Sequence, residues 1–187
     1  MSTLLSQPAG ITPEDLLRMP DAVSYELVDG KLVERHVSME SSRVALRIGR
    51  ILGNEAERTG ECTVYPPDLG YQCFPDDPRK VRKPDVSAIR KEKLAALGVG
   101  DRGYSPIPAD LAIEVVSPND LYNEVFDKVQ EYLAAGFGVV WVVAPALKIV
   151  TVYRQDETIA LLHANQAITA EPAFATLRLQ VADFFAE

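Results

Sequence analysis

Two almost wholly apolar segments separated by an amphipathic segment constrain the fold of this chain more than any other feature. Residues 111–116 and 139–144 are each typical of a strand that is covered on both faces of a sheet. Between them the sequence predicts a helix over about residues 121–135, with Asn119 or Asp120 as its N-cap. A strand, a helix and a strand in this order predict two parallel strands joined by a right-handed crossover.

The first third of the chain predicts a hairpin followed by a long helix. Residues 12–19 begin with Thr-Pro-Glu-Asp, which is typical of a capped helix start. Residues 24–34 contain two short apolar stretches around an Asp-Gly pair, which predicts a tight type I′ hairpin. Residues 40–58 carry apolar residues at helical spacing and therefore predict a long amphipathic helix.

The remaining segments predict short strands and a closing element. The predicted strands cover residues 63–65, 69–74, 85–89, 149–154 and 158–163, and residues 181–185 predict a final turn or helix. A chain of 187 residues can bury about 70% of its surface without disulfides. We therefore expect one α/β (α+β) domain over residues 1–187, with a mixed sheet flanked by helices and an N-terminal hairpin.

Charge, cysteine content and the N-terminal sequence bound the possible functions. The net charge of −8 argues against a high-affinity DNA coat protein. Residues 1–93 hold 14 Lys and Arg against 15 Asp and Glu, whereas residues 94–187 hold 5 against 12, so a polyanion would meet the first half. Cys62 and Cys73 are too few for a disulfide framework and are expected to be ordinary buried thiols. Because no signal-like or membrane-spanning segment is evident, we expect a cytoplasmic protein that does not bind membranes.

Glu114 breaks the pattern of its own segment, because it stands within the most apolar predicted strand of the chain. Burial of an unpaired carboxylate costs several kcal/mol, so Glu114 needs a cationic partner. One interpretation is a structural ion pair with a buried lysine or arginine. The other is a functional site.

Lys128 breaks the pattern of the predicted helix in the same way. At about 100° per residue, Lys128 falls on the apolar stripe of Val125 and Tyr132 rather than on the solvated face. Lys128 lies about 12 Å from the start of the predicted helix, which runs antiparallel to the preceding strand. At about 3.3 Å per strand residue, this distance places Lys128 beside the centre of the strand at residues 111–116. We therefore expect the Lys128 ammonium within about 4–6 Å of the Glu114 carboxylate. The alternative is that Lys128 pairs with Glu124 or Glu131 on its own helix.

Asp85 is the third residue of this pattern, because it opens a short predicted strand directly after Pro84. A Pro-Asp pair alone is common in turns. Together with Glu114 and Lys128, however, Asp85 would complete two carboxylates and a cation on one sheet. Two hard oxygen ligands with waters suit Mg²⁺ or Mn²⁺.

At these residues the sequence resembles the Uma-two family of restriction-endonuclease-like proteins, within the PD-(D/E)XK nuclease superfamily. The resemblance runs through the segments Tyr-Glu-Leu-Val-Asp-Gly at 25–30, Pro-Asp-Val-Ser at 84–87, Glu-Val-Val-Ser-Pro at 114–118, Val-Trp-Val-Val at 140–143 and Val-Thr-Val-Tyr-Arg at 150–154. It implies a mixed sheet flanked by helices.

The resemblance also implies roles for individual residues. Asp85 and Glu114 resemble the two metal-binding carboxylates, and the carbonyl of Val115 resembles a third ligand. The superfamily's usual lysine position is a valine here, and Lys128 matches the arrangement in which the lysine has moved to the following helix. Glu26 resembles an acidic residue near the site, although a plain strand carboxylate is an equal alternative.

Basic residues of the first half are candidates for phosphate contacts. They are Arg43, Arg47 and Arg50 on one stripe of the long helix, with Arg79, Lys80, Arg82 and Lys83 before the predicted Asp85 strand. A solvated charged face is the ordinary alternative for such a stripe. His36 is expected to be a surface residue.

The resemblance, with the candidate metal site, implies a Mg²⁺- or Mn²⁺-dependent DNA endonuclease. It also implies a homodimer, because double-strand cleavage by a small nuclease normally needs two active sites. Two other readings stay open. One is a nuclease-like fold without catalysis that binds nucleic acid or protein. The other is an enzyme with the same metal site and a substrate other than DNA.

Overall fold

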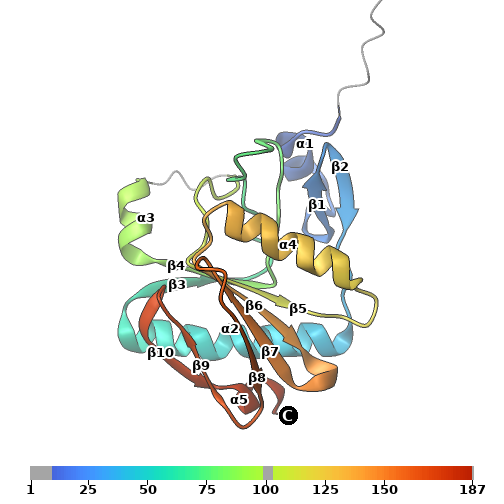
Figure 1. Ribbon diagram of the computed structural model, residues 1–187. Helices are drawn as coiled ribbons and strands as arrows, with labels where there is room; N and C mark the ends of the chain where they lie inside the picture. The colour runs from blue at the N-terminus through green and yellow to red at the C-terminus, as the bar shows by residue number, and fades with distance from the viewer. Residues whose placement is uncertain (1–9, 99–102, 187) are drawn as a thin grey trace, which may run out of the picture.

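A six-stranded mixed sheet forms the centre of the protein in a computed structural model that describes residues 10–98 and 103–186 (Figure 1). Its strands are β3 (Cys62–Tyr65), β4 (Val86–Arg90), β5 (Leu111–Val115), β6 (Val139–Ala144), β7 (Ile149–Arg154) and β8 (Ile159–His163), in that order across the sheet. The pair β5 and β6 is parallel, and every other neighbouring pair is antiparallel. The predicted parallel pair and the meander that follows it are confirmed.

Among the described residues, five α-helices and two small hairpins surround this sheet. The helices are α1 (Pro13–Arg18), α2 (Met39–Thr59), α3 (Lys91–Leu97), α4 (Tyr122–Ala134) and α5 (Val181–Phe185). The hairpins are β1 (Tyr25–Val28) with β2 (Lys31–Glu34), and β9 (Ala167–Ala170) with β10 (Phe174–Gln180). The sheet flanked by helices and the N-terminal hairpin match the expected fold class.

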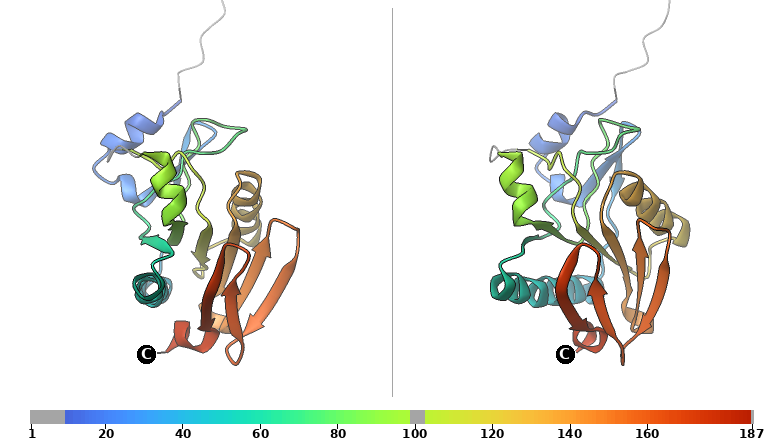
Figure 2. Two further views of the ribbon diagram at one scale, coloured as in Figure 1. Left: turned by 90° about the vertical axis from the view of Figure 1, so that its left-hand side faces the viewer. Right: turned by 60° about the vertical axis from the view of Figure 1, so that its left-hand side comes forward.

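The alternation of side chains along β5 and β6 divides the core into two layers. Ile113 and Trp141 face the layer that holds α2, the β9–β10 hairpin and α5. Ala112 and Val140 face the layer that holds Val129 and the rest of α4's apolar stripe. In Figures 1 and 2, α4 and α2 accordingly lie on opposite faces of the sheet. Both faces of β5 are therefore buried, which explains its nearly continuous apolar sequence.

The capping residue of α1 and the turn residues of the β1–β2 hairpin have the predicted conformations. Thr12 caps α1, because its side chain accepts a hydrogen bond from the Asp15 backbone N–H, and the Asp15 carboxylate accepts one from the Thr12 backbone N–H. Asp29 and Gly30 both have positive φ values, 51° and 71°, as the type I′ turn requires. The hairpin is joined to the remainder of the chain by paired backbone hydrogen bonds between Leu27 and Val81.

The structure corrects two sequence expectations and adds three elements that were not expected. Residues 69–74 do not form a strand, because Tyr71 alone makes isolated bridges, to Arg82 and Ser105, within a proline-rich segment. Asp120 does not cap α4: its carboxylate accepts a hydrogen bond from the Ser117 N–H instead. The sequence reading also missed α3, β9 and β10, whose short segments lack a clear apolar period.

The expectation that the N-terminal segment is neither a signal sequence nor a membrane span concerns in part residues 1–9, which lie outside the described residues. Within residues 10–98 and 103–186, no helix is long and apolar enough to span a membrane.

Candidate active site

Asp85 and Glu114 lie opposite each other where β4 and β5 meet. Val86 pairs with Ile113 in the antiparallel register, so the residue before Val86 stands opposite the residue after Ile113. Both carboxylates consequently project on the face away from Val86 and Ile113, toward α4, and line one pocket. The expectation that Asp85 and Glu114 share one side of the sheet is confirmed.

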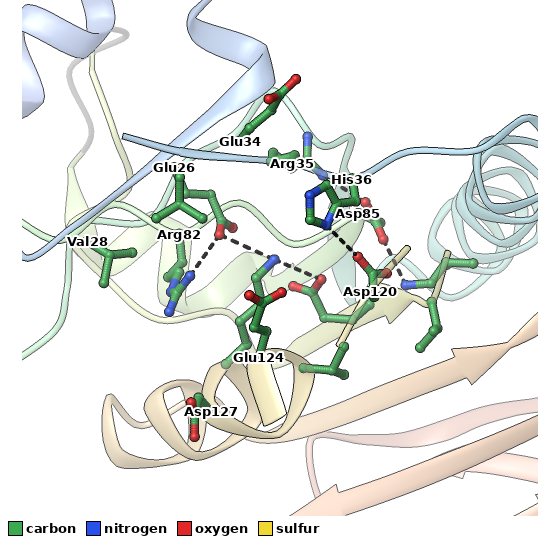
Figure 3. Close-up of a pocket in the computed structure, with 16 residues that line it drawn as sticks. Glu26, Val28, Glu34, Arg35, His36, Arg82, Asp85, Asp120, Glu124 and Asp127 are labelled. Atoms are coloured by element: carbon green, nitrogen blue, oxygen red, sulfur yellow. Dashed lines mark hydrogen bonds and ion pairs between the residues drawn. The ribbon is translucent and has the colours of Figure 1, made fainter. Parts of the chain in front are cut away.

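Lys128 joins Glu114 to Glu26 across this pocket (Figure 3). Its Nζ lies 3.4 Å from Glu114 Oε2 and 3.3 Å from Glu26 Oε2. The predicted proximity of Lys128 and Glu114 is confirmed, at a shorter distance than expected. Lys128 does not pair with Glu124 or Glu131, because the α4 stripe that carries it faces the sheet.

Glu114 is held on its other side by a tyrosine of the same helix. The Tyr132 hydroxyl donates a 2.7 Å hydrogen bond to Glu114 Oε1, and both residues are buried. Tyr132 follows Lys128 by one helical turn, so one stripe of α4 supplies both partners of the carboxylate. The sequence reading used Tyr132 only as an apolar marker, although its hydroxyl on that stripe was the available signal.

Asp85 has two partners that the sequence reading did not identify. Its Oδ1 accepts a 2.7 Å hydrogen bond from Arg35 Nη2, and its Oδ2 accepts a 2.8 Å bond from the Val115 backbone N–H. Arg35 follows β2 directly, so the N-terminal hairpin delivers this guanidinium to the sheet. No local pattern marks Arg35, because its partner lies 50 residues further along the chain.

Glu26 is almost completely buried, with 1% of its surface exposed. Besides Lys128, it accepts hydrogen bonds from Arg82 Nη1 at 2.9 Å and from the Lys83 backbone N–H at 2.8 Å. Burial alone would raise the pKa of Glu26, but the charges of Lys128 and Arg82 outweigh burial and hold this pKa below its usual value. Glu26 therefore contacts the Lys128 ammonium from the hairpin side of the pocket.

The pKa values of Asp85 and Glu114 are raised, whereas the pKa of Glu26 is lowered. Burial raises the pKa of Glu114 to about 7, because the attraction of Lys128 does not compensate and repulsion from Asp85 and Glu26 adds to the rise. Burial also raises the pKa of Asp85, although Arg35 opposes it. In both carboxylates burial is therefore the main cause of the raised pKa, and the neighbouring cation reduces the rise without cancelling it.

The pocket has a volume of about 230 Å³ and an acidic lining. Its carboxylates are Glu26, Glu34, Asp85, Glu114, Asp120, Glu124 and Asp127, and its basic side chains are Arg35, His36, Arg82 and Lys128. His36, expected on the surface, lines the pocket opening, with Nδ1 3.5 Å from Asp120 Oδ1 (Figure 3). Within the described residues, no group of three or more His, Cys, Asp or Glu side chains is arranged to hold a metal ion.

The expectation that Arg82 and Lys83 contact phosphates from an exposed basic surface is corrected. Only 7% of Arg82 and 2% of Lys83 is exposed. Arg82 lies between Glu26 and Glu131, and the Lys83 ammonium donates to the Ala22 carbonyl. Arg82 therefore compensates carboxylates under the N-terminal hairpin, and Lys83 bonds the backbone of the segment before that hairpin, which an isolated sequence segment does not reveal.

Two arginines of the basic stripe of α2 donate hydrogen bonds to backbone carbonyls within the protein. Arg47 Nε donates to the Asp183 carbonyl, and Arg43 Nη1 donates to the Ala186 carbonyl at 2.9 Å. Carbonyls at the end of a helix attract cations, so these contacts attach α5 to α2. Arg50 lies on the same stripe and lines two surface hollows beside α2.

We expect Glu131→Gln to lower the free energy of unfolding by about 1–3 kcal/mol at pH 7. Burial would raise the pKa of Glu131, but hydrogen bonds and charge from Arg82 and Lys80 outweigh it and lower this pKa. A lowered folded-state pKa stabilises the protein above the unfolded-state pKa, and this stabilisation is lost as the pH falls through the folded-state value. Urea unfolding from pH 7 to pH 3 should show the difference between wild type and variant shrinking below about pH 4. A pH-independent difference would contradict the assignment.

The fold is shared with a protein of known structure. A solved structure from Anabaena variabilis, described as "a putative nuclease belonging to DUF820", has the same fold, with a TM-score of 0.76 and 18% sequence identity over 94% of this chain and 97% of that chain. The mixed sheet flanked by helices is therefore a nuclease-like fold. The sequence matches the Uma2 family, described as "Putative restriction endonuclease", over residues 13–182. This chain belongs to that family. No curated protein sequence matches it.

Proposed function

We propose that this protein is a Mg²⁺- or Mn²⁺-dependent DNA endonuclease that hydrolyses phosphodiester bonds. The observation that carries the proposal is the meeting of Asp85, Glu114 and Lys128 in one acidic pocket, with Lys128 Nζ 3.4 Å from Glu114. Family membership and the fold support a nuclease-like function. The metal dependence, the DNA substrate and the catalytic roles are our proposal.

The residues of the pocket fit a hard divalent cation. Asp85 and Glu114 offer carboxylate oxygens on one face of the sheet, within a pocket whose lining holds more carboxylates than basic side chains. The Val115 carbonyl is the proposed third ligand. Mg²⁺ commonly takes one or two carboxylates and keeps several waters, so a cluster of three side chains is not required. When bound, the metal would polarise a phosphate oxygen and activate a water.

The side chains of this chain would position and stabilise the reacting groups. Lys128 would orient the attacking water and stabilise negative charge that develops on the phosphate. Glu26 holds the Lys128 ammonium in place from the opposite side. Tyr132 fixes the Glu114 carboxylate through its hydrogen bond to Oε1.

Titration with Mn²⁺ by calorimetry tests the metal part of this proposal. We expect the wild-type protein to bind Mn²⁺ and Asp85→Ala to bind it about 10- to 100-fold more weakly, because one of two carboxylate ligands is removed. Asp127→Ala is the matched control, since Asp127 lines the same pocket without contacting the proposed ligands. Equal affinities for wild type and Asp85→Ala would refute the site. Incubation with duplex DNA, single-stranded DNA and RNA in Mg²⁺ then tests the substrate class.

A second candidate is a nuclease-like module that binds nucleic acid without cleaving it. The observation that favours it is the 2.7 Å ion pair between Arg35 and Asp85, which compensates a proposed metal ligand with a side chain. Wild-type protein that binds DNA but neither binds Mn²⁺ nor cleaves any nucleic acid would establish this alternative.

DNA is the proposed partner, and its phosphates would meet the basic stripe of α2. Of the residues first considered, Arg43, Arg47 and Arg50 remain candidates because all three line one hollow beside α2. Arg43 already donates to Glu40 and to the Ala186 carbonyl, and Arg47 donates to the Asp183 carbonyl, so a phosphate would compete with these contacts. The proposal includes a cytoplasmic location, with which the free thiols Cys62 and Cys73 agree.

We also propose a homodimer formed along the edge strand β8. Ile159 and Leu161 project from this edge strand with 63% and 53% of their surfaces exposed, which is unusual for an unprotected sheet edge. Size-exclusion chromatography with light scattering is expected to give twice the mass of the chain. Leu161→Glu should give the monomer mass, because charge at a paired edge opposes its copy. A wild-type monomer at micromolar concentration would refute the dimer.

A further inference from the structure

The Asp85 carboxylate, a proposed metal ligand, already has a cation bound to it. Arg35 Nη2 lies 2.7 Å from Asp85 Oδ1, and the Val115 backbone N–H donates a 2.8 Å hydrogen bond to Oδ2. Lys128, the other cation of the proposed site, forms its ion pairs with two other carboxylates. Arg35 is therefore the residue that neutralises Asp85 by direct contact.

Asp85 is also the main partner of the Arg35 guanidinium. The hydrogen bond from Arg35 Nη1 to the Val23 carbonyl is 3.4 Å long, which is longer than the roughly 2.7–3.2 Å of a typical N–H···O bond. The backbone of Arg35 is fixed independently, because its N–H donates a 2.9 Å hydrogen bond to the Ser24 carbonyl. The side chain can therefore leave Asp85 while the end of the hairpin that carries it stays in place.

A divalent cation and the Arg35 guanidinium would compete for Asp85. A metal held by the same carboxylate oxygen at about 2.1 Å would lie within about 5 Å of the guanidinium nitrogen. Like charges at this distance repel each other strongly where water is partly excluded. A metal would therefore gain Asp85 as a ligand by replacing Arg35 rather than by binding beside it.

The Arg35 side chain has space into which it can turn. Arg35 and Asp85 line the acidic pocket, and they also line an open groove of about 520 Å³ beside α2. A displaced arginine can lay its apolar stem along such a surface while its guanidinium stays hydrated. Its departure from the pocket therefore does not require the core to open.

We propose that Arg35 determines the affinity and selectivity of the proposed metal site, because a cation binds at Asp85 only by displacing the Arg35 guanidinium. The inference rests on the proposed function and deepens it by naming the residue that regulates its metal site. A divalent cation offers Asp85 twice the charge of the guanidinium, whereas Na⁺ and K⁺ offer no more charge than Arg35 does. The exchange therefore favours divalent cations, and it makes the wild-type site weaker than the same ligands would be without Arg35.

Calorimetric titration with Mn²⁺ at constant pH and ionic strength tests this displacement. Arg35→Met removes the guanidinium and keeps an apolar stem. We expect this variant to bind Mn²⁺ at least about tenfold more tightly than wild type, since a cation beside an aspartate changes its proton affinity by about 10- to 10³-fold. Arg79→Met is the matched control and should bind as wild type does, because Arg79 carries the same charge, is exposed, and lines neither the pocket nor the groove.

Two further variants separate displacement from a change in folding. Arg35→Lys keeps a competing cation beside Asp85, so it should bind Mn²⁺ more weakly than Arg35→Met. Arg35→Met combined with Asp85→Asn removes the ligand for which the two cations compete, so it should lose the gain in affinity. Circular dichroism checks that each variant is folded.

Modification of the wild-type protein by phenylglyoxal, which reacts with accessible arginines, measures the displacement without any substitution. Only 9% of the Arg35 side chain is exposed, so Arg35 should react slowly in EDTA. Its reaction rate, followed by peptide mass spectrometry, should rise when Mn²⁺ saturates the site. Arg79 is the exposed reference and should react equally fast in both conditions. An unchanged Arg35 rate in saturating Mn²⁺ would overturn the displacement.

The results separate this inference from the proposed function. Arg35→Met that binds Mn²⁺ no more tightly than wild type refutes the displacement, even where Asp85→Ala has lost binding and the metal site itself stands. Mn²⁺ binding by Arg35→Met but not by wild type supports the competition and refutes a metal-dependent nuclease, because Arg35 then keeps the site closed. Absence of Mn²⁺ binding in both proteins refutes both proposals.

Discussion

Lys128→Ala is expected to reduce Mg²⁺-dependent DNA cleavage by about 10²- to 10³-fold, the loss typical of removing one charge-stabilising donor from an active site. The ammonium lies 3.3 Å from Glu26 and 3.4 Å from Glu114, where it would face the reacting phosphate. The measurement is the single-turnover rate at saturating protein. Lys91→Ala, which removes an exposed lysine of α3, is the control and should cleave at the wild-type rate.

The same variant is expected to lose about 3–5 kcal/mol of unfolding free energy, because two buried carboxylates would lose their shared cation. Low stability alone could then reduce activity. A second variant, Lys128→Met with Glu26→Gln, removes one charge of each sign, leaves both proposed metal ligands in place, and should recover part of the stability without recovering cleavage. Cleavage at the wild-type rate by folded Lys128→Ala would exclude Lys128 as the catalytic cation.

Arg82→Met is expected to lower the free energy of unfolding by about 3–5 kcal/mol, measured by urea unfolding at pH 7. Arg82 bonds Glu26 through Nη1 at 2.9 Å and Glu131 through Nε at 2.6 Å, and 8% of its side chain is exposed. Its loss would leave buried negative charge without compensation. Arg82→Lys should lose less stability, because the charge remains while the forked hydrogen bonds do not.

Arg79→Met provides the comparison for Arg82→Met. Arg79 lies three residues earlier and is exposed, so its replacement should change stability by at most about 0.5 kcal/mol. A loss in Arg82→Met no larger than in Arg79→Met would mean that Arg82 does not hold the carboxylates beneath the hairpin.

The elements that the sequence predicts well are those whose burial is periodic and whose partners are close in the chain. The apolar segments β5 and β6 and the stripe of α4 follow from side-chain alternation and helical period. The contact between Lys128 and Glu114 was predictable for the same reason. The two residues are 14 positions apart and are joined by one strand, one turn and one helix.

Short strands without a clear period were less predictable. The segment at residues 69–74 looks like a strand, yet only Tyr71 finds bridging partners. Residues of β9 and β10 form a hairpin because the layer beneath the sheet buries Ile168 and Phe174. Such segments take their structure from the surface they cover, which local propensity does not describe.

The sequence by itself determined the central strand, helix and strand, the basic stripe of α2, and the pairing of Lys128 with Glu114. Only the tertiary structure decided which charges compensate one another around that pair. Arg35 meets Asp85 across 50 residues of chain, and Arg82 meets Glu26 across 56. These contacts exist because the N-terminal hairpin packs beside α4 and the sheet. Since a buried charge requires a partner but any cation can supply it, the requirement is visible in the sequence and the identity of the partner is not.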